Sequence, residues 1–364
     1  MTLAYIGFSS ISNQKHSAAA HSGIAQSDFT CALLSELEEV KYFICLDNKV
    51  ELRERNNKIP VPLRICYPKL ILDSVRFYFI IKKKGPFRKI IIYHSFLFLP
   101  LIVLLRLTGN EFILQVNEVF SRAGSHNPLI YKVFEKIMFY FSSGYILAAS
   151  PLSKHLPQHK LKHLKEIPLI PGPIFNSEYA DVVGDNNICR LVYAGVVDRK
   201  KVGGAFIAVE LANLLDDARY SLDIYGYGMK HDIQDLELQI NSCNLESRTK
   251  VRYLGSLAHA DLINKLVNYD VGLATQYIGT SFSASSFPSK ILTYLSAGLH
   301  TISASSPPVR EWSFSNVIYI YSDKNLVDLV SHIKSLEVVD KSRVRKNISL
   351  IRGSMLTSLG KLIE

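Results

Sequence analysis

The sequence predicts an α/β protein built from two Rossmann-like domains, each with a doubly wound parallel sheet. Three observations support this fold class: a regular alternation of strands and helices in the second half, a less regular one in the first half, and a Pro/Gly-rich segment between them. Short connections between alternating strands and helices are typical of a parallel sheet covered on both faces. Right-handed crossovers then make the sheet doubly wound. A chain of 364 residues is long enough for two separate cores.

In the first half, short apolar runs predict strands and longer periodic segments predict helices. The predicted strands cover residues 3–8, 42–46, 90–94, 112–116 and 145–148, and the predicted helices cover 24–39 and 128–141. Residues 96–107 are very apolar, but Pro100 interrupts them and they are too short to cross a bilayer. They are interpreted as a loop and a buried helix, with a membrane span as the alternative.

In the second half the alternation is regular. Strands are predicted at residues 190–195, 220–226, 250–255, 271–275, 300–304 and 317–321, and helices at 204–215, 230–242, 258–268, 288–297 and 326–336. The Pro/Gly-rich residues 167–175 suit a hinge. The domains are therefore predicted at 1–170 and 171–340, followed by a basic helix at 341–364 for which packing on the first domain is one option. Two such domains are expected to face each other across a cleft that takes a two-part substrate.

Composition narrows the protein class. A hydrophobic content of 48% and a charged content of 20% are typical of a folded chain. The first ten residues lack the basic start and apolar run of a secretory signal. The cysteines are scattered and have no metal-ligand spacing, which favours reduced thiols in a cytoplasmic protein. They are Cys31, Cys45, Cys66, Cys189 and Cys243.

The formal charge is +10, and the basic excess is concentrated between Lys41 and Arg106. A cluster there is flanked by aromatic and aliphatic residues and consists of Lys82, Lys83, Lys84, Arg88 and Lys89. Such a patch suits nucleic acid, anionic lipid or an acidic substrate. No nucleic-acid motif accompanies it, so an anionic membrane surface is favoured and nucleic acid is not expected. A solvated basic face is the alternative.

Residues 287–304, FPSKILTYLSAGLHTISA, indicate a phosphate site. Pro288 suits the first turn of a short helix and Gly298 suits its end. Lys290 would then lie at the positive end of the helix dipole, which is unfavourable unless an anion binds there. Thr293 shares the face of Lys290, and an ordinary surface lysine on a core helix is the alternative.

Further candidates for donor binding follow the predicted strands. Arg199, Lys200 and Lys201 come just before a helix N-terminus, an arrangement suited to a diphosphate, although a plain basic turn is the alternative. Glycines that allow close approach of a ligand, and serines before Lys290, complete one expected pocket. These residues are Gly195, Gly226, Gly228, Gly255, Ser286 and Ser289. The GxG at Gly226 is incomplete as a dinucleotide motif, so a dehydrogenase is disfavoured.

In the first half, His16, His21 and Gly23 are expected in a loop after the first strand, and Glu118 follows the strand at 112–116. A Glu or His at the floor of a cleft suits a general base toward a sugar hydroxyl. Glu118 and His21 are therefore the candidate catalytic residues. A structural or solvent-exposed role is the alternative. No metal-binding motif is present.

These motifs together resemble the GT-B glycosyltransferases, and family 4 most closely. In the second half the resemblance is carried in order by AGVVDRKKVGG at 194–204, LDIYGYG at 222–228, and VRYLGSL with DVGLAT and FPSKILTYLSAGL within 251–299. In the first half, residues 90–122 resemble the family's strand–helix–strand leading to an acidic residue, and PLIPGPIFN at 168–176 resembles its hinge.

The resemblance implies transfer of a sugar from a nucleoside-diphosphate donor, with no required metal or cofactor. Arg199, Lys200 or Lys201, and Lys290 match positions that neutralise the donor diphosphate. Ser285 and Thr293 stand where family 4 has a pair of glutamates, so ribose recognition and the stereochemical outcome stay open. Some bacterial surface-polysaccharide transferases, galactofuranosyltransferases among them, carry a similar FPSK helix without that pair.

The sequence thus predicts a cytoplasmic glycosyltransferase, peripheral on the inner face of a bacterial plasma membrane. Its expected donor is a UDP-sugar, and its expected acceptor is a hydroxyl of a lipid-linked or oligosaccharide glycan in surface-polysaccharide synthesis, such as lipopolysaccharide or O-antigen. A nucleotide-sugar epimerase of the same fold and a non-catalytic binding partner are the alternatives.

Overall fold

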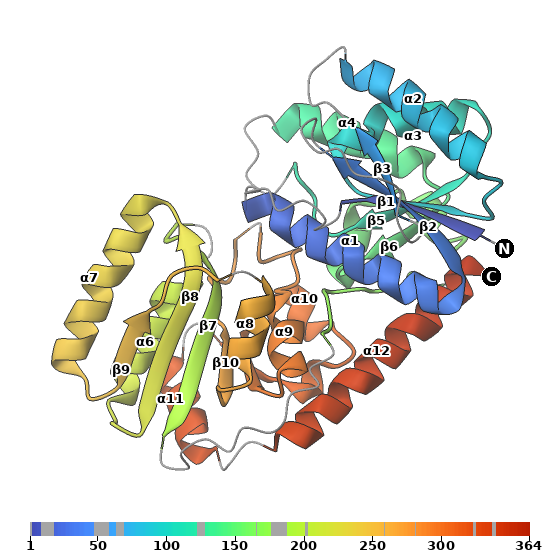
Figure 1. Cartoon of the computed structure of the whole chain (residues 1–364). Helices are drawn as coiled ribbons and strands as arrows, with labels where there is room; N and C mark the ends of the chain where they lie inside the picture. Colours follow the sequence, from blue (N-terminus) through green and yellow to red (C-terminus); the bar gives the residue numbers. More distant parts are fainter. Residues whose placement is uncertain are drawn as a thin grey trace. The chain divides into compact units, whose positions relative to one another are not determined.

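The computed structural model divides the chain into two units, Met1–Pro173 with Gly353–Glu364, and Ile174–Arg352 (Figure 1). The structure describes residues 2–8, 18–46, 58–62, 69–121, 128–164, 166–175, 188–200, 203–257, 259–280, 282–322, 325–336 and 340–364, without the side chains of 18–24, 45–46, 60, 62 and 259–260. The first boundary lies within the predicted Pro/Gly-rich hinge. The second lies inside the last helix, whose final turns belong to the first unit.

The first unit contains a six-stranded parallel sheet in the order β3-β2-β1-β4-β5-β6. Its strands are β1 (Thr2–Gly7), β2 (Glu39–Leu46), β3 (Lys58–Pro62), β4 (Ile90–Tyr93), β5 (Phe112–Val116) and β6 (Gly144–Leu147). This is the strand order of a Rossmann fold. All strands are parallel, and the order in which they are added to the sheet reverses between β1 and β4, which is the switch point. Ligands of such sheets bind outside the carboxyl ends of the strands at that switch point.

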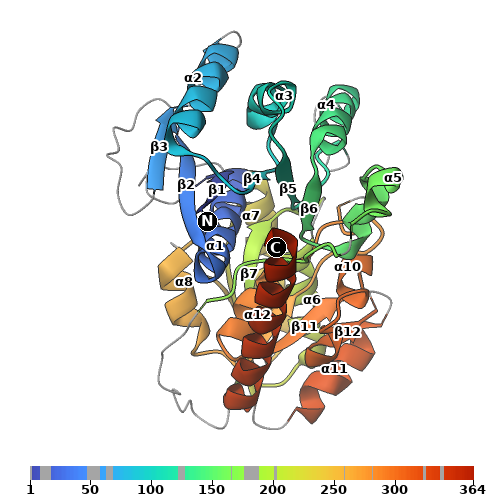
Figure 2. The same cartoon turned by 90° about the vertical axis from the view of Figure 1, so that its right-hand side faces the viewer.

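One layer of three helices covers one face of this sheet, and α1 covers the other (Figure 2). The bounds are α1 (Ala18–Leu37), α2 (Lys69–Lys84), η1 (Phe96–Phe98), α3 (Leu99–Leu107), α4 (Pro128–Phe141), η2 (Ser150–His155) and α5 (Gln158–Leu161). A buried network ties the layers together, because the Tyr5 hydroxyl donates to Gln115 and the Gln115 amide donates to Thr30 on α1.

The second unit repeats this topology with a sheet in the order β12-β11-β10-β7-β8-β9. Its strands are β7 (Cys189–Val197), β8 (Tyr220–Gly228), β9 (Lys250–Tyr253), β10 (Val271–Ala274), β11 (His300–Ala304) and β12 (Tyr319–Tyr321). The switch point therefore lies between β7 and β10.

Helices α6, α7 and α11 pack on one face of the second sheet, and α8 and α9 lie on the other (Figure 1). The bounds are α6 (Gly204–Leu215), α7 (Lys230–Glu246), α8 (His259–Leu266), α9 (Lys290–Ser296), α10 (Pro307–Arg310), η3 (Ser315–Val317), α11 (Leu326–Ser335) and α12 (Lys341–Ile363). In the second half the predicted strands and helices are confirmed to within a few residues.

The differences from the predicted elements lie mainly in the first half. No strand is predicted at β3, whose sequence, KIPVP, contains two prolines. The structure accommodates them because β3 is an edge strand. Helix α1 begins at Ala18, so the prediction that His21 and Gly23 lie in a loop is wrong. The predicted buried helix within residues 96–107 is confirmed as α3, which follows the 3-10 helix η1 at 96–98. No helix in the described part of the chain combines the length and hydropathy of a membrane span.

Arg88 and Lys89 of the predicted basic cluster contact the C-terminal residues of the chain, and Lys82 donates to the Asn110 side chain at 3.1 Å. Arg88 forms an ion pair with Glu38 at 2.6 Å and donates to the carbonyl of Glu364. The Lys89 ammonium donates to the carbonyl of Leu362 at 2.6 Å. These two residues therefore hold the C-terminal turns of α12 at the amino ends of the strands, while Lys82 and Lys83 on α2 are exposed.

Candidate functional site

The switch point of the second sheet is bridged by Tyr294 on α9. Strands β7 and β10 pair at Leu191 with Val271 and at Val192 with Gly272. Beyond these pairs, the buried Tyr294 hydroxyl accepts a hydrogen bond from the Ala194 N–H at 2.8 Å and donates to the carbonyl of Leu273 at 3.3 Å. The tyrosine thus replaces a direct strand–strand hydrogen bond and fixes α9 over the point where the strands separate.

Gly272 makes room for this tyrosine. A Cβ at this position would lie 2.4 Å from the ring of Tyr294, so a larger residue would displace α9 from the sheet.

Lys290 lies one helical turn before Tyr294, on the same face of α9. Its ammonium is 4.0 Å from the centroid of the Tyr193 ring, and it borders Gly195, where a Cβ would lie 2.8 Å from Nζ. No carboxylate among the described residues pairs with it. Burial of the ammonium lowers the pKa of Lys290 to about 7. A desolvated cation faced only by an aromatic ring is incompletely stabilised, and an anion is the partner that completes its environment.

Helix α9, which carries Lys290, begins two residues later and ends one residue earlier than the predicted helix at 288–297. Pro288 lies just before the helix and its carbonyl accepts from the Ile291 N–H at 2.9 Å, while Gly298 follows the helix with a φ of 78°. Thr293 is half-buried and its hydroxyl points back to the carbonyl of Ser289 at 3.5 Å. Ser286 is buried and Ser289 is exposed.

Two glycines, Gly203 and Gly204, allow the N-terminus of α6 to lie close to Tyr193 and Thr275. Gly203 has a φ of 63°, and a Cβ on Gly204 would lie 2.2 Å from the carbonyl oxygen of Thr275. The Thr275 hydroxyl donates to the Gly204 carbonyl at 2.7 Å. The same Cβ would lie 2.7 Å from the ring of Tyr193, the ring that carries the Lys290 ammonium. The structure therefore brings Lys290 and the N-terminus of α6, whose first N–H groups have no partner within a helix, to one tyrosine.

Asp198 shapes the basic loop before α6. Its carboxylate accepts from the Lys200 N–H at 2.9 Å, and its carbonyl accepts from the Gly203 N–H at 2.8 Å. Arg199 pairs with Asp235 on α7 at 3.4 Å and stacks on Phe206, so its charge is already partly neutralised.

The other members of the predicted basic group differ in how far they can be placed. The side chain of Lys200 is exposed, whereas Lys201 lies outside the described residues. Binding of the donor by this loop therefore stays a prediction.

The glycines of the GxG motif have a packing role. A Cβ on Gly226 would lie 2.1 Å from the carbonyl oxygen of Gly195, and one on Gly228 would lie 2.2 Å from that of Val197. The motif therefore lets β8 approach β7 beside the site. A Cβ on Gly255 would meet no described atom within 4 Å, so close packing does not require a glycine there. Its φ of 73° does, because only glycine adopts this turn conformation readily. Donor contacts by these glycines stay predictions.

Buried polar atoms without a partner gather at the carboxyl ends of the strands. Among the described residues of the second unit they include Gln276 Nε2, after β10, and Ser306 Oγ, after β11. Buried polar groups are almost always hydrogen-bonded, so such atoms indicate a place for a ligand or water. Gln276 is absent from the predicted site residues, although its position just after a strand is the signal that also selects Glu118.

The carboxyl edge of the first unit shows the same feature. The buried His94 follows β4, and its Nδ1 lies 3.2 Å from the carbonyl of Glu118 while Nε2 has no partner among the described residues. Burial lowers the pKa of His94 to about 4, so the imidazole is neutral near pH 7. The Asn117 side-chain amide donates to the Tyr93 hydroxyl at 3.2 Å. Its side-chain oxygen, Oδ1, is buried and has no partner in the described part of the chain. Glu118 is half-buried beside them.

The loop that carries Glu118 is held by Glu135 on α4. The Glu135 carboxylate accepts from the Phe120 N–H and the Ser121 hydroxyl, both at 2.6 Å. Burial raises the pKa of Glu135. Of the other predicted residues in this unit, His21 and Gly23 are helical, and His16 lies outside the described residues.

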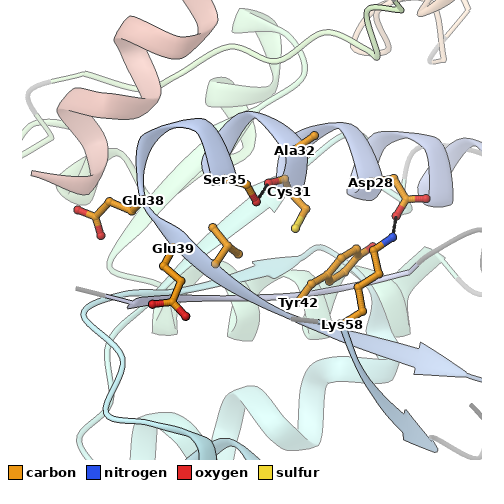
Figure 3. Close-up of a pocket in the computed structure, with 9 residues that line it drawn as sticks. Asp28, Cys31, Ala32, Ser35, Glu38, Glu39, Tyr42 and Lys58 are labelled. Carbon is orange, nitrogen blue, oxygen red and sulfur yellow. Dashed lines mark hydrogen bonds and ion pairs between the residues drawn. The ribbon is translucent and has the colours of Figure 1, made fainter. Parts of the chain in front are cut away.

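A separate pocket of about 300 Å³ lies between α1 and the amino-terminal half of β2 (Figure 3). Its charged side chains are engaged within the protein, since Lys58 pairs with Asp28 at 3.9 Å and Glu38 pairs with Arg88. Cys31 in this pocket is buried, and burial raises the pKa of its thiol to about 12. The pocket is remote from the carboxyl ends of the strands, so it is not the candidate site.

Replacing Tyr294 with phenylalanine is expected to lower the free energy of unfolding by about 1–3 kcal/mol, because the buried Ala194 N–H loses its acceptor. Urea unfolding measures this change. Tyr227→Phe is the matched control, because the Tyr227 side chain is exposed, and it is expected to leave stability within about 0.5 kcal/mol. Equal stability of the two variants would show that the hydroxyl bridge does not hold the switch point.

Solved structures with the same fold cover nearly the whole chain. HepE of Anabaena in complex with UDP has a TM-score of 0.68 at 12% identity and covers 100% of this chain and 98% of its own. A glycosyltransferase of Rickettsia africae has a TM-score of 0.68 at 13% identity, covering 100% and 97%. The lipopolysaccharide outer core galactosyltransferase WaaB has a TM-score of 0.61 at 13% identity, covering 99% and 98%.

No family model matches the sequence, and no curated protein matches it in sequence. The structural likeness and the two parallel six-stranded sheets confirm the predicted fold class of two Rossmann-like units. The placement of the units across a cleft stays a prediction. The chain has the GT-B fold.

Proposed function

We propose that this protein transfers a sugar from a nucleoside-diphosphate donor, a UDP-sugar, to a hydroxyl of an acceptor glycan. The observation that carries the proposal is the Lys290 ammonium, which lies against Tyr193 beside the N-terminus of α6 and pairs with no carboxylate among the described residues. A switch point that offers a cation and free N–H groups suits a diphosphate. The UDP complex of HepE, a protein of the same fold, supports the choice of nucleotide.

In the proposed reaction the bond between the sugar and the diphosphate breaks, and negative charge builds on the leaving nucleotide. Lys290 and the α6 N–H groups stabilise that charge, which is the interaction that lowers the barrier. Lys200 and Lys201 add further positive charge, as does Arg199 once it leaves Asp235. The proposal requires no metal, because these groups neutralise the diphosphate.

The first unit supplies the acceptor side in this proposal. Glu118 takes the proton from the attacking hydroxyl as general base. The neutral His94 beside it has an Nε2 without a partner among the described residues, which suits it to accept a hydrogen bond from an acceptor hydroxyl. His94 itself is a weak base, because burial lowers its pKa to about 4.

We further propose that the acceptor is a lipid-linked glycan of bacterial surface-polysaccharide synthesis, so that the enzyme works at the inner face of the plasma membrane. The net charge of +10 supports contact with anionic lipid. The lipopolysaccharide transferase WaaB, which has the same fold, supports the class of pathway. A galactofuranosyl donor is the narrower proposal, supported by the FPSK helix without a glutamate pair.

UDP is expected to raise the melting temperature of the protein above the shifts given by GDP, ADP and dTDP, because only a bound ligand stabilises the folded state. At about 100 times its dissociation constant, a ligand contributes about 2.7 kcal/mol. A thermal-shift series measures this effect, and labelled UDP-sugars then test transfer with and without a glycan acceptor. An epimerase converts the donor without an acceptor, and a non-catalytic partner leaves it intact. If no diphosphate stabilises the protein, the donor site does not exist.

Glu118→Gln separates donor binding from catalysis. This variant is expected to keep the UDP-dependent melting shift and to lose transfer, because an amide does not accept the proton. Transfer at the wild-type rate would assign the base to another residue.

A further inference from the structure

Helix α4 exposes several apolar residues and buries a charged one. The sequence places Leu129, Val133, Ile137 and Phe141 at helical spacing, which is typical of a buried stripe. In the structure, however, Leu129 is 77% exposed and Val133 is 54% exposed, while Glu135 is only 3% exposed. The charged residue therefore faces inward and part of the apolar stripe faces outward.

The inward position of Glu135 has a structural cause. Its carboxylate accepts hydrogen bonds from the loop after β5, at Phe120 and Ser121. This contact orients α4 and turns Leu129 and Val133 away from the sheet. Burying them would stabilise the protein, because removing apolar surface from water is favourable. Exposed apolar residues that gather on one surface are typical of an interaction site.

Helices α2, α3 and α4 lie side by side and form one layer (Figure 2). We call the outward side of this layer the α2–α4 face. Every exposed large hydrophobic residue among the described positions of the first unit lies on it. These residues are Ile71, Leu72, Phe79, Leu107, Leu129, Ile130, Val133 and Tyr140. The apolar side chains are thus concentrated on a single layer.

The same face is basic. Its exposed charged residues are Lys69, Arg76, Lys82, Lys83, Arg106, Lys132 and Lys136. The three helices contain only two acidic residues, Asp73 and Glu135, and both are buried. Arg76 pairs with the buried Asp73 at 3.7 Å, and the other six positive charges reach solvent without an exposed acidic residue on these helices to offset them.

We propose that the α2–α4 face docks on an anionic lipid bilayer, with Leu129, Ile130 and Val133 entering the interface and the lysines contacting lipid head groups. Apolar and basic residues on one surface are the combination that interfacial membrane binding requires. A second copy of the chain is a poorer occupant, because two such faces carry like charge. This inference rests on the membrane location within the proposed function and assigns the contact to particular residues. Lys132 and Lys136 take part in it, whereas Arg88 and Lys89 bind the end of α12 instead.

Vesicle flotation with the full chain tests the apolar part. The protein is expected to float with vesicles of phosphatidylglycerol and phosphatidylethanolamine and to stay in solution with phosphatidylcholine alone. Leu129→Asp combined with Val133→Asp is expected to reduce binding to the anionic vesicles at least tenfold. Leu238→Asp combined with Leu245→Asp is the matched control on α7, where these leucines are 68% and 88% exposed, and it is expected to bind like the wild type.

Neutralising lysines tests the electrostatic part. Each lysine near an anionic surface contributes about 1 kcal/mol, or about fivefold in affinity. Lys132→Gln combined with Lys136→Gln is therefore expected to weaken binding about 30-fold at low salt and less at high salt. Lys265→Gln combined with Lys334→Gln on the second unit is the control and is expected to have no effect.

The outcomes distinguish this inference from the proposed function. Absence of wild-type flotation, equal binding to neutral vesicles, or full binding by the α4 variants would overturn the membrane inference. A dimer in solution that these variants dissociate would assign the face to self-association instead. The UDP-dependent melting shift is measured without lipid, so a failed donor site leaves the flotation result standing, and the reverse holds as well.

Discussion

Replacing Lys290 with alanine is expected to weaken UDP binding by about ten- to a hundredfold. The ammonium faces Tyr193 at 4.0 Å and is a charged group at the switch point for which no carboxylate partner is found among the described residues. Hydrogen bonds to charged groups contribute about 1.5–3 kcal/mol, which corresponds to that range. Isothermal titration calorimetry measures the dissociation constant. The loss in kcat/KM for sugar transfer is expected to be at least as large, because the diphosphate gains charge in the transition state.

The pH dependence of binding gives a sharper signature of Lys290. Its pKa in the free protein is about 7, so the ammonium is already formed at lower pH. Above pH 7 the lysine must take up a proton when the diphosphate binds, and affinity is expected to fall by up to about tenfold per pH unit. The Lys290→Ala variant is expected to lose this dependence. Calorimetry in two buffers with different ionisation enthalpies would count the proton directly.

The same pKa has a consequence for stability. Between about pH 7 and pH 10.5 the unfolded chain keeps a proton on Lys290 that the free folded protein releases. The folded state is therefore expected to gain stability as the pH rises across this window, and Lys290→Ala removes the gain.

Lys265→Ala on α8 is the control, because this lysine is exposed. It is expected to bind UDP like the wild type at every pH. A wild-type affinity that stays constant above pH 7, or an unchanged affinity in Lys290→Ala, would remove Lys290 from the donor site.

Replacing Gly204 with alanine is expected to destabilise the second unit by about 2 kcal/mol or more. The new Cβ would lie 2.2 Å from the backbone carbonyl of Thr275 and 2.7 Å from the ring of Tyr193, so α6 or β10 has to move. Overpacking of this kind typically costs about 1–3 kcal/mol, and more when backbone must shift. Urea unfolding followed by the fluorescence of Trp312, the single tryptophan of the chain and buried in the second unit, reports on this unit.

Gly353→Ala is the matched control. It is the same substitution inside helix α12, where a Cβ would meet no described atom within 4 Å. It is expected to raise stability by about 0.5–1 kcal/mol, because alanine is the better helix former. If Gly204→Ala were as stable as Gly353→Ala, the close contact between α6 and β10 would not be needed for the site.

Much of the fold can be predicted from the sequence, because the second half alternates between apolar strands and amphipathic helices with short connections. Lys290 could also be singled out from the sequence, because a lysine in the first turn of a helix opposes the helix dipole. The rest depends on contacts between distant residues. The proline-containing β3 is a strand only because it lies at a sheet edge, and His94 reaches the site only because β4 lies at the switch point.

Distant contacts also explain two further differences between local pattern and structure. The stripe on α4 has the spacing of a buried face, but its orientation is set by Glu135, which binds a loop that follows another strand. Arg199 has the sequence context of a phosphate ligand, but α7 places Asp235 against it. Neither partner is visible from the local pattern, because both come from elements distant in the chain.

Residue type and local spacing were sufficient to define the periodicity of the elements, their order, and the position of a cation at the start of a short helix. They did not define which side chains meet: Tyr193 under the Lys290 ammonium, Tyr294 between the separating strands, and Glu135 turned inward on α4. These contacts emerge only in the folded chain, because burial and charge partners depend on where distant segments return in space, which spacing along the chain does not encode.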